Sequence, residues 1–181
     1  MYLRSSDASG QAPVPARTGT NADLASGYQR VITADGFSGT GVRDASGAVV
    51  GGATITAIPD THQYVVTVPK DELGGVDLAT AGYALTMMSH AGDDEGAGGI
   101  RPVYDLAYWQ STAGTDMSWI HDYRFGGGAG EWTGDNAAKD TDSSDPNVLD
   151  VLVPDGSTQA GVLDYHAQSP VVLPYVGLTR P

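Results

Sequence analysis

The chain contains no cysteine among its 181 residues, which excludes a disulfide framework and a thiolate metal site. Lysine is almost absent too, because Lys70 and Lys139 are the only two. No apolar run approaches the length that crosses a bilayer, so we expect no membrane insertion. The N-terminal residues MYLRSSDASG are too polar for a signal peptide. If the protein is exported, we expect the signal to lie outside this chain.

Acidic residues dominate the charge. Asp and Glu number 22 against 9 Lys and Arg, which gives a net charge of -13. A chain this acidic repels nucleic acid and anionic membranes, so neither is an expected partner. One explanation is adaptation to high salt, where screening removes the self-repulsion, and the Asp-rich, Lys-poor composition resembles that of proteins from salt-loving archaea. The other explanation is a calcium-loaded extracellular module, and the two are compatible.

Short β-type runs separated by Gly, Pro and Asp turns predict an all-β fold, a β-sandwich with long loops and little helix. Residues 1–27 are expected to be a loop-rich segment with a strand end at Tyr2 and Leu3, and residues 28–181 the sandwich domain. The clearest hairpin has arms at 54–58 and 63–68. Helical turns are expected at PKDELGG, closed by Gly74 and Gly75, and at QAGVLDYH. Further strands are expected near 28–37, 83–89, 147–153 and 169–178, and two short strands joined around Ala45–Gly47 are expected within 39–52.

Several motifs stand in one order: YVVTVPKDELGG, GYALTMMSHAGDDEGAGGIRPV, YRFGGGAG, SDPNVLDVLVPDG with QAGVLDYH, and VVLPYVGL. Together they resemble the C-terminal DOMON-like, surface-layer-homology-like module of glucodextranase and amylopullulanase-type enzymes, over roughly Tyr28 to Leu178. The resemblance implies a β-sandwich like that of DOMON domains and some carbohydrate-binding modules. It also implies an accessory role beside a glycoside hydrolase or in the cell envelope, outside the cell. It does not carry the hydrolase activity, so we expect no enzyme.

The sequence departs from the family pattern in two places. Family members usually carry additional strands before the segment that matches MYLRSSDASG, so the domain is expected to lack N-terminal strands. Such a sheet would expose an unpaired edge, and we expect self-association or a partner chain that supplies the missing strands. The stretch YDLAYWQSTAGTDMSWIHDY between RPV and RFGGG is the second departure, since it is long and aromatic.

Aromatic residues gather between residues 101 and 132. Sugar binding needs aromatic faces for the ring and planar polar groups for the hydroxyls. The alternative is that these aromatic side chains fill the core or hold a long loop in place. The predicted carbohydrate-binding residues are Arg101, Tyr104, Tyr108, Trp109, Trp119, Tyr123 and Trp132.

Two Asp-rich stretches could hold calcium, which needs several hard oxygen ligands that converge. The alternative is a solvated acidic surface, because neither stretch has the spacing of an EF-hand loop. The predicted metal ligands are Asp93, Asp94, Glu95, Asp140, Asp142 and Asp145.

Other chemistries are not expected. RFGGG is followed by poor helix-forming sequence and acidic residues, so it predicts no nucleotide site. The four histidines are far apart in sequence, which argues against zinc, and no G-x-S-x-G elbow is present. Haem is not expected, because Met87 and Met88 on a strand point to opposite faces and cannot both serve one iron.

The sequence therefore predicts a non-catalytic module that binds a glycan or cell-surface polymer, or anchors a larger assembly to the cell envelope. The alternative is a structural or protein-interaction component of a surface layer, filament or envelope assembly without a sugar site. Exposure of Trp109, Trp119 and Trp132 on one face would separate the two.

Overall fold

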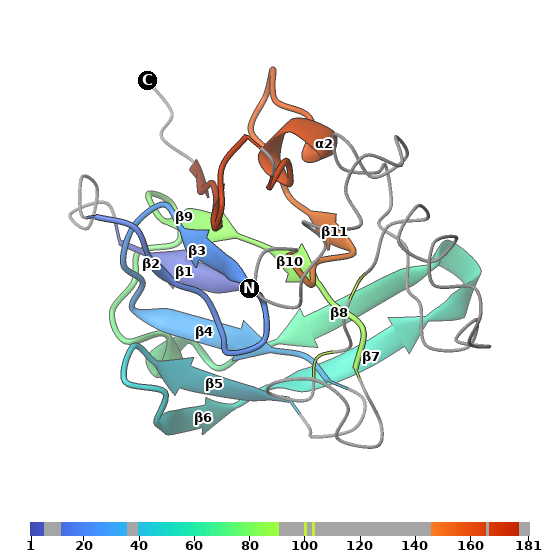
Figure 1. The fold of residues 1–181 in the computed structure, drawn as a ribbon. Coiled ribbons are helices and arrows are strands. Elements are labelled where there is room, and N and C mark those ends of the chain that lie inside the picture. The colour runs from blue at the N-terminus through green and yellow to red at the C-terminus, as the bar shows by residue number, and fades with distance from the viewer. Residues whose placement is uncertain are drawn as a thin grey trace. The chain divides into compact units, whose positions relative to one another are not determined.

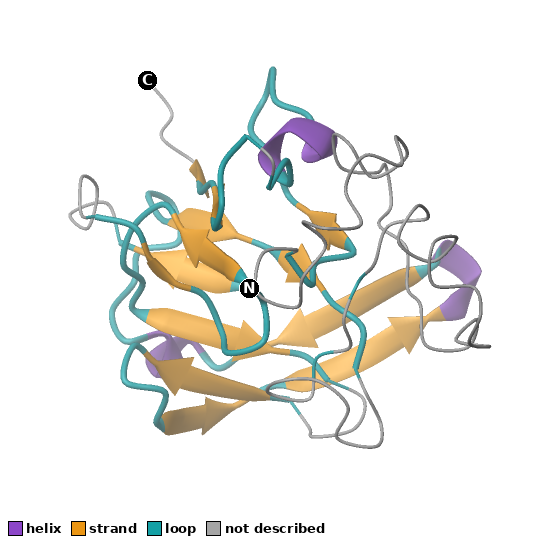
Figure 2. Ribbon diagram, viewed as in Figure 1, coloured by secondary structure: helices purple, strands orange, loops and turns teal. Residues whose placement is uncertain are grey.

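The computed structural model describes residues 1–5, 12–35, 40–90, 100, 103, 146–165 and 167–177. Strands dominate these residues, with only short helical turns, so the predicted all-β fold is confirmed (Figures 1 and 2). The chain forms two compact units. Unit 1 comprises Met1–Gln11, Ser26–Tyr83 and Gly177–Pro181, and unit 2 comprises Ala12–Ala25 and Ala84–Val176. The division into residues 1–27 and 28–181 stays a prediction.

Unit 1 is built on a six-stranded sheet with the order β13-β9-β1-β4-β5-β6. β1 pairs antiparallel with β4, and β4 pairs antiparallel with β5. The chain passes between the two units within β9 and β13. The strand bounds are β1 Tyr2–Arg4, β4 Arg30–Thr33, β5 Gly41–Asp44, β6 Val49–Gly52, β9 Gly82–Ala84 and β13 Val176–Gly177.

The turn between β5 and β6 follows from its residue types. The Asp44 carboxylate accepts hydrogen bonds from the backbone N–H of Ser46 at 2.9 Å and of Ala48 at 3.1 Å, and from the Ser46 hydroxyl at 2.6 Å. Gly47 has a φ of 84°, a left-handed conformation that glycine adopts without a steric penalty. These contacts reverse the chain where the sequence predicted two strands joined around Ala45–Gly47.

A second antiparallel pair in unit 1 is the predicted hairpin. β7 (Thr54–Ile58) and β8 (Gln63–Thr67) pair from Thr54↔Thr67 to Ile58↔Gln63, with the 3-10 turn η2 (Pro59–Thr61) at the bend. Both arms are rich in β-branched residues, which favour strands. Pro59 presets the backbone at the start of η2. The hairpin prediction is confirmed, apart from Val68, which follows β8.

The core of unit 1 joins the sheet to a second 3-10 turn, η3 (Lys70–Leu73). Leu3, Ile32 and Val42 on β1, β4 and β5 form one buried cluster with Leu73. Burial of a Leu side chain is typically worth about 1.5–3 kcal/mol. Leu73 therefore fixes the position of the loop that follows it.

The described residues of unit 2 form two small sheets and one helical turn. β3 (Ala22–Leu24) lies between β2 (Val14–Pro15), which is antiparallel to it, and β12 (Val171–Leu173), which is parallel to it. β10 (Thr86–Met87) pairs with β11 (Asp150–Val151), and α2 spans Gln159–Val162. The Thr158 hydroxyl caps α2 by accepting the Gly161 N–H at 3.1 Å.

Within the first 27 residues, β1 contains the strand end predicted at Tyr2 and Leu3, whereas β2 and β3 lie where the sequence predicted loop. These strands are short, and their partners lie far along the chain. Val171 pairs with Ala22, for example. Local hydrophobic periodicity carries no signal for a two- or three-residue strand of this kind.

Candidate functional site: a hollow at the double-glycine loop

A surface hollow of about 370 Å³ lies within unit 1. Three chain segments form it: the residue after β1, the residue before β4, and the loop between η3 and β9. The lining residues are Ser5, Gln29, Gly74, Gly75, Val76, Asp77 and Thr80. Most of these are polar or glycine, so the hollow offers hydrogen-bonding groups rather than an apolar surface.

The double glycine that follows η3 shapes one wall of the hollow. Gly74 caps η3 with a φ of 65°, and Gly75 has a φ of 78°. Other L-residues adopt this left-handed conformation only at a cost of about 1–2 kcal/mol. Leu73, just before the pair, is buried in the unit 1 core. The loop is therefore anchored at one end and exposed at its glycines, where a ligand can approach the backbone closely.

Arg30 at the start of β4 holds this loop in place. Its Nε donates to the Glu72 carbonyl at 2.9 Å, and its Nη1 donates to the Gln29 carbonyl at 2.8 Å. The guanidinium packs against Gly74 so closely that a Cβ on that residue would overlap it. Gly74 is thus required both for its backbone conformation and for its lack of a side chain.

The polar side chains around the hollow are held by local hydrogen bonds. The Ser5 N–H donates to Gln29 Oε1 at 2.6 Å, which fixes the amide. Asp77 Oδ1 accepts the Ala79 N–H at 3.0 Å, and the Asp77 carbonyl accepts the Thr80 N–H at 3.1 Å. Donors and acceptors fixed in this way suit a ligand with several hydroxyl groups. None of the described residues that line the hollow is aromatic.

Among the described residues of unit 1, two ionisable groups have displaced pKa values. Burial raises the pKa of Tyr28, and the negative charge of Asp44 raises it further. The hydrogen bond from the Ser46 hydroxyl lowers the pKa of Asp44, as do the backbone N–H groups of its turn and the positive charge of Arg30. Asp44 is therefore a stable carboxylate at neutral pH. Arg30 lies opposite it in the pairing of β4 with β5.

A family model for the C-terminal, surface-layer-homology-like binding module of glucodextranase matches residues 1–174. The chain belongs to this family. The resemblance in the sequence is thereby confirmed, and the match extends to the first residue. A comparison with curated proteins finds no match. This glucodextranase-type module is thus a binding or anchoring domain, an accessory part rather than the hydrolytic part of such an enzyme.

Three of the motifs have clear roles in the structure of the module. VPK-x-x-LGG supplies η3, the buried Leu73 and the glycine wall of the hollow. The motif PNV supplies a buried cross-link in unit 2. Asn147 Nδ2 donates to the Gly19 carbonyl at 2.8 Å, and its Oδ1 accepts the Val103 N–H at 3.0 Å. The motif G-x-RPV contributes two buried residues, Ile100 and Val103.

The predicted site residues all lie outside the described residues. The structure neither brings the carbohydrate-binding set together nor separates it, and both sets stay predictions. The carbohydrate-binding set is Arg101, Tyr104, Tyr108, Trp109, Trp119, Tyr123 and Trp132. The metal set is Asp93, Asp94, Glu95, Asp140, Asp142 and Asp145.

Within the described ranges, no three His, Asp or Glu side chains come close enough to hold a metal ion. Calcium binding by the acidic residues just named stays a prediction. In the same part of the chain, no helix combines the length and apolar character needed to cross a membrane.

Sequence reasoning missed the hollow. Ser5, Gln29 and Asp77 come from segments far apart in the sequence, and no residue spacing connects them. One signal was present: a glycine pair directly after a helical turn predicts two left-handed residues and hence an open backbone surface. From the sequence, the glycine pair is expected only to end the helical turn.

Proposed function

We propose that this chain is a carbohydrate-binding module that attaches a glycoside-hydrolase-type protein to a glycan or cell-surface polymer outside the cell. The observation that carries the proposal is the family match over residues 1–174. Glucodextranase is named for a glucan of the dextran type, so dextran is the first ligand to test. Anchoring to an envelope polymer would use the same carbohydrate-binding activity, with a different polysaccharide as the ligand.

The proposed ligand contacts are of two kinds. The hollow at Gly74 and Gly75 supplies hydrogen-bonding groups, among them the Asp77 carboxylate and the Thr80 hydroxyl. The aromatic residues between 101 and 132, which are predicted to bind carbohydrate, supply stacking surfaces. Each stacking contact is typically worth about 0.5–1.5 kcal/mol beyond area burial. Polysaccharide sites commonly use hydrogen bonds for orientation and aromatic faces for affinity, and each kind of contact is proposed and tested by itself.

The test is isothermal titration of the full chain with dextran and with a panel of envelope polysaccharides. Asp77→Asn keeps an acceptor for the Ala79 N–H, and Thr80→Val keeps the shape of the side chain, so both should fold normally. Either change should weaken binding if the hollow holds the ligand. Gln168→Ala, at an exposed position of unit 2, is the control and should bind as the wild type does.

The aromatic contacts are tested separately by Trp109→Ala, Trp119→Ala and Trp132→Ala. At least one should lose binding while the circular dichroism spectrum stays unchanged. If the three bind normally and the hollow variants do not, the hollow alone is the site. A wild type that binds no polysaccharide overturns the proposal and favours the structural alternative.

We also propose that the protein works at high salt, because its net charge is -13 with two lysines. Self-repulsion extends over a Debye length of about 30 Å at 0.01 M salt but only about 3 Å at 1 M. The thermal unfolding midpoint should therefore rise from low to molar KCl. A midpoint that does not change with KCl would contradict this part of the proposal.

A further inference from the structure

Residues 45–69 contain a single charged residue, Asp60, although the chain as a whole carries 31. Strands β6, β7 and β8 lie in this stretch, and none of them contains a charged residue. We call these three strands the neutral ribbon. A protein with a net charge of -13 repels copies of itself over most of its surface, and this repulsion is weaker at the neutral ribbon.

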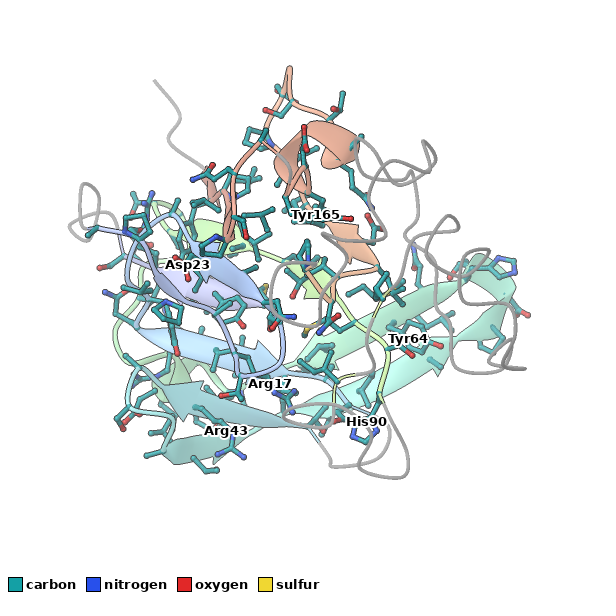
Figure 3. All side chains as sticks on the ribbon, in the orientation of Figure 1. Arg17, Asp23, Arg43, Tyr64, His90 and Tyr165 are labelled. Carbon is teal, nitrogen blue, oxygen red and sulfur yellow. The ribbon has the colours of Figure 1, made fainter. Side chains whose placement is uncertain are left out.

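The neutral ribbon is also apolar and exposed. All residues of β7 and β8 are exposed, and Tyr64 is 75% exposed (Figure 3). Because cross-strand partners share a face, the pairs Ile55↔Val66 and Ala57↔Tyr64 make one face apolar along its length. The ribbon holds seven of the eleven exposed large hydrophobic residues in the described part of the chain: Val49, Val50, Ile55, Ile58, Tyr64, Val65 and Val66. An apolar gathering of this size marks an interaction surface.

The ribbon has an open backbone edge. Among the described strands, β7 and β8 pair only with each other, and β6 is the outer strand of the six-stranded sheet. In Figure 1, β6 and β7 follow one another along the margin of unit 1, with β5 and β8 on their inner sides. An isolated two-stranded hairpin is marginally stable in water, and natural edges are usually protected by charges or proline. β6 and β7 contain neither charged residues nor proline, so their open edge can pair with another strand.

We propose that the β6–β7 edge pairs antiparallel with the same edge of a second copy, forming a two-fold symmetric dimer. A strand that pairs antiparallel with its own copy generates a two-fold axis by itself, so the contact closes without further surface. Charge favours the second copy over a basic partner, because a basic protein would be drawn to the acidic surface rather than to the ribbon. The proposal is independent of glycan binding.

Sedimentation equilibrium of the full chain in 2 M KCl tests the dimer. The wild type should dimerise. Ile55→Glu and Ile58→Glu, both on β7, each place two like charges in the symmetric contact, one from each copy, and should weaken dimerisation at least about tenfold. Leu152→Glu is the matched control, since Leu152 is 41% exposed against 40% for Ile55 and lies outside the ribbon. This control should dimerise as the wild type does.

Each variant is first checked by circular dichroism, and Val50→Glu on β6, at the same edge, replaces any variant that does not fold. Wild-type dimerisation should strengthen from 0.1 to 2 M KCl, because salt screens the repulsion between copies. Several results would overturn the proposal. One is a wild type that is monomeric at all concentrations. This includes a monomer in which other residues of the same chain protect the hairpin amides from hydrogen exchange. The others are equal weakening in Leu152→Glu and dimerisation that weakens as KCl rises.

Discussion

The Gly74–Gly75 loop of unit 1 and the Pro146–Val148 segment of unit 2 both carry motif residues, yet their exposure is opposite. Pro146, Asn147 and Val148 are buried, whereas both glycines are exposed. Asn147 links two backbone segments inside unit 2, and the glycines form the wall of a surface hollow. The motif residues of this chain thus have two roles. Some hold the interior together, and others leave a backbone surface open.

The largest effect is expected from Asn147→Ala in the buried segment. The change leaves the Gly19 carbonyl and the Val103 N–H without their partner, and each buried unpaired group costs about 1–3 kcal/mol. The free energy of unfolding, measured by urea denaturation, should fall by about 2–5 kcal/mol. Asn147→Asp should recover part of the loss, because it can still accept from Val103. Stability within about 0.5 kcal/mol of the wild type would mean that the cross-link is dispensable.

A smaller effect is expected at the glycine loop, where two substitutions separate strain from contact. Gly75→Ala forces a left-handed alanine with no atom in its way and should cost about 1–2 kcal/mol. Gly74→Ala imposes the same strain and also displaces the Arg30 guanidinium, so it should cost more. Equal losses in the two variants would show that the contact between Arg30 and Gly74 adds nothing.

The smallest effect is expected at the exposed turn of Asp44. Its folded-state pKa is lowered, so its charged form stabilises the fold above the unfolded-state pKa of about 3.9. This contribution disappears as the pH falls through the lower, folded-state pKa. The stability difference between the wild type and Asp44→Asn should be constant near pH 7 and shrink below about pH 4. A difference that does not vary with pH would contradict the assigned cause.

The sequence predicted the local parts of unit 1 well. The hairpin of β7 and β8 follows from β-branched residues on both sides of Pro59, and the glycine cap of η3 follows from Gly74. It predicted a strand at 147–153, but only Asp150–Val151 is one. The residues just before it are buried, and Asn147 among them makes hydrogen bonds to distant segments. Hydrophobic periodicity does not reveal either role.

Non-local features were beyond sequence reasoning. β1 and β3 are strands because Tyr2 pairs with Val31 and Ala22 with Val171, and these partners cannot be inferred from the Gly- and Ser-rich N-terminal segment. The hollow is non-local in the same way, since Ser5 meets Gln29 only after β1 and β4 pair. The predicted aromatic and acidic sites rested on composition alone, and they lie outside the described residues.

The most direct test of glycan binding at the glycine loop is a titration of the ¹⁵N-labelled chain with dextran and with envelope polysaccharides, followed by amide NMR shifts. Binding at the hollow predicts saturable shifts at the amides of Gly74, Gly75 and Asp77, while the buried amide of Asn147 stays unchanged. Saturable shifts that leave the glycine loop unchanged would move the site elsewhere in the chain. No saturable shift with any polysaccharide would contradict the proposal that this module binds carbohydrate.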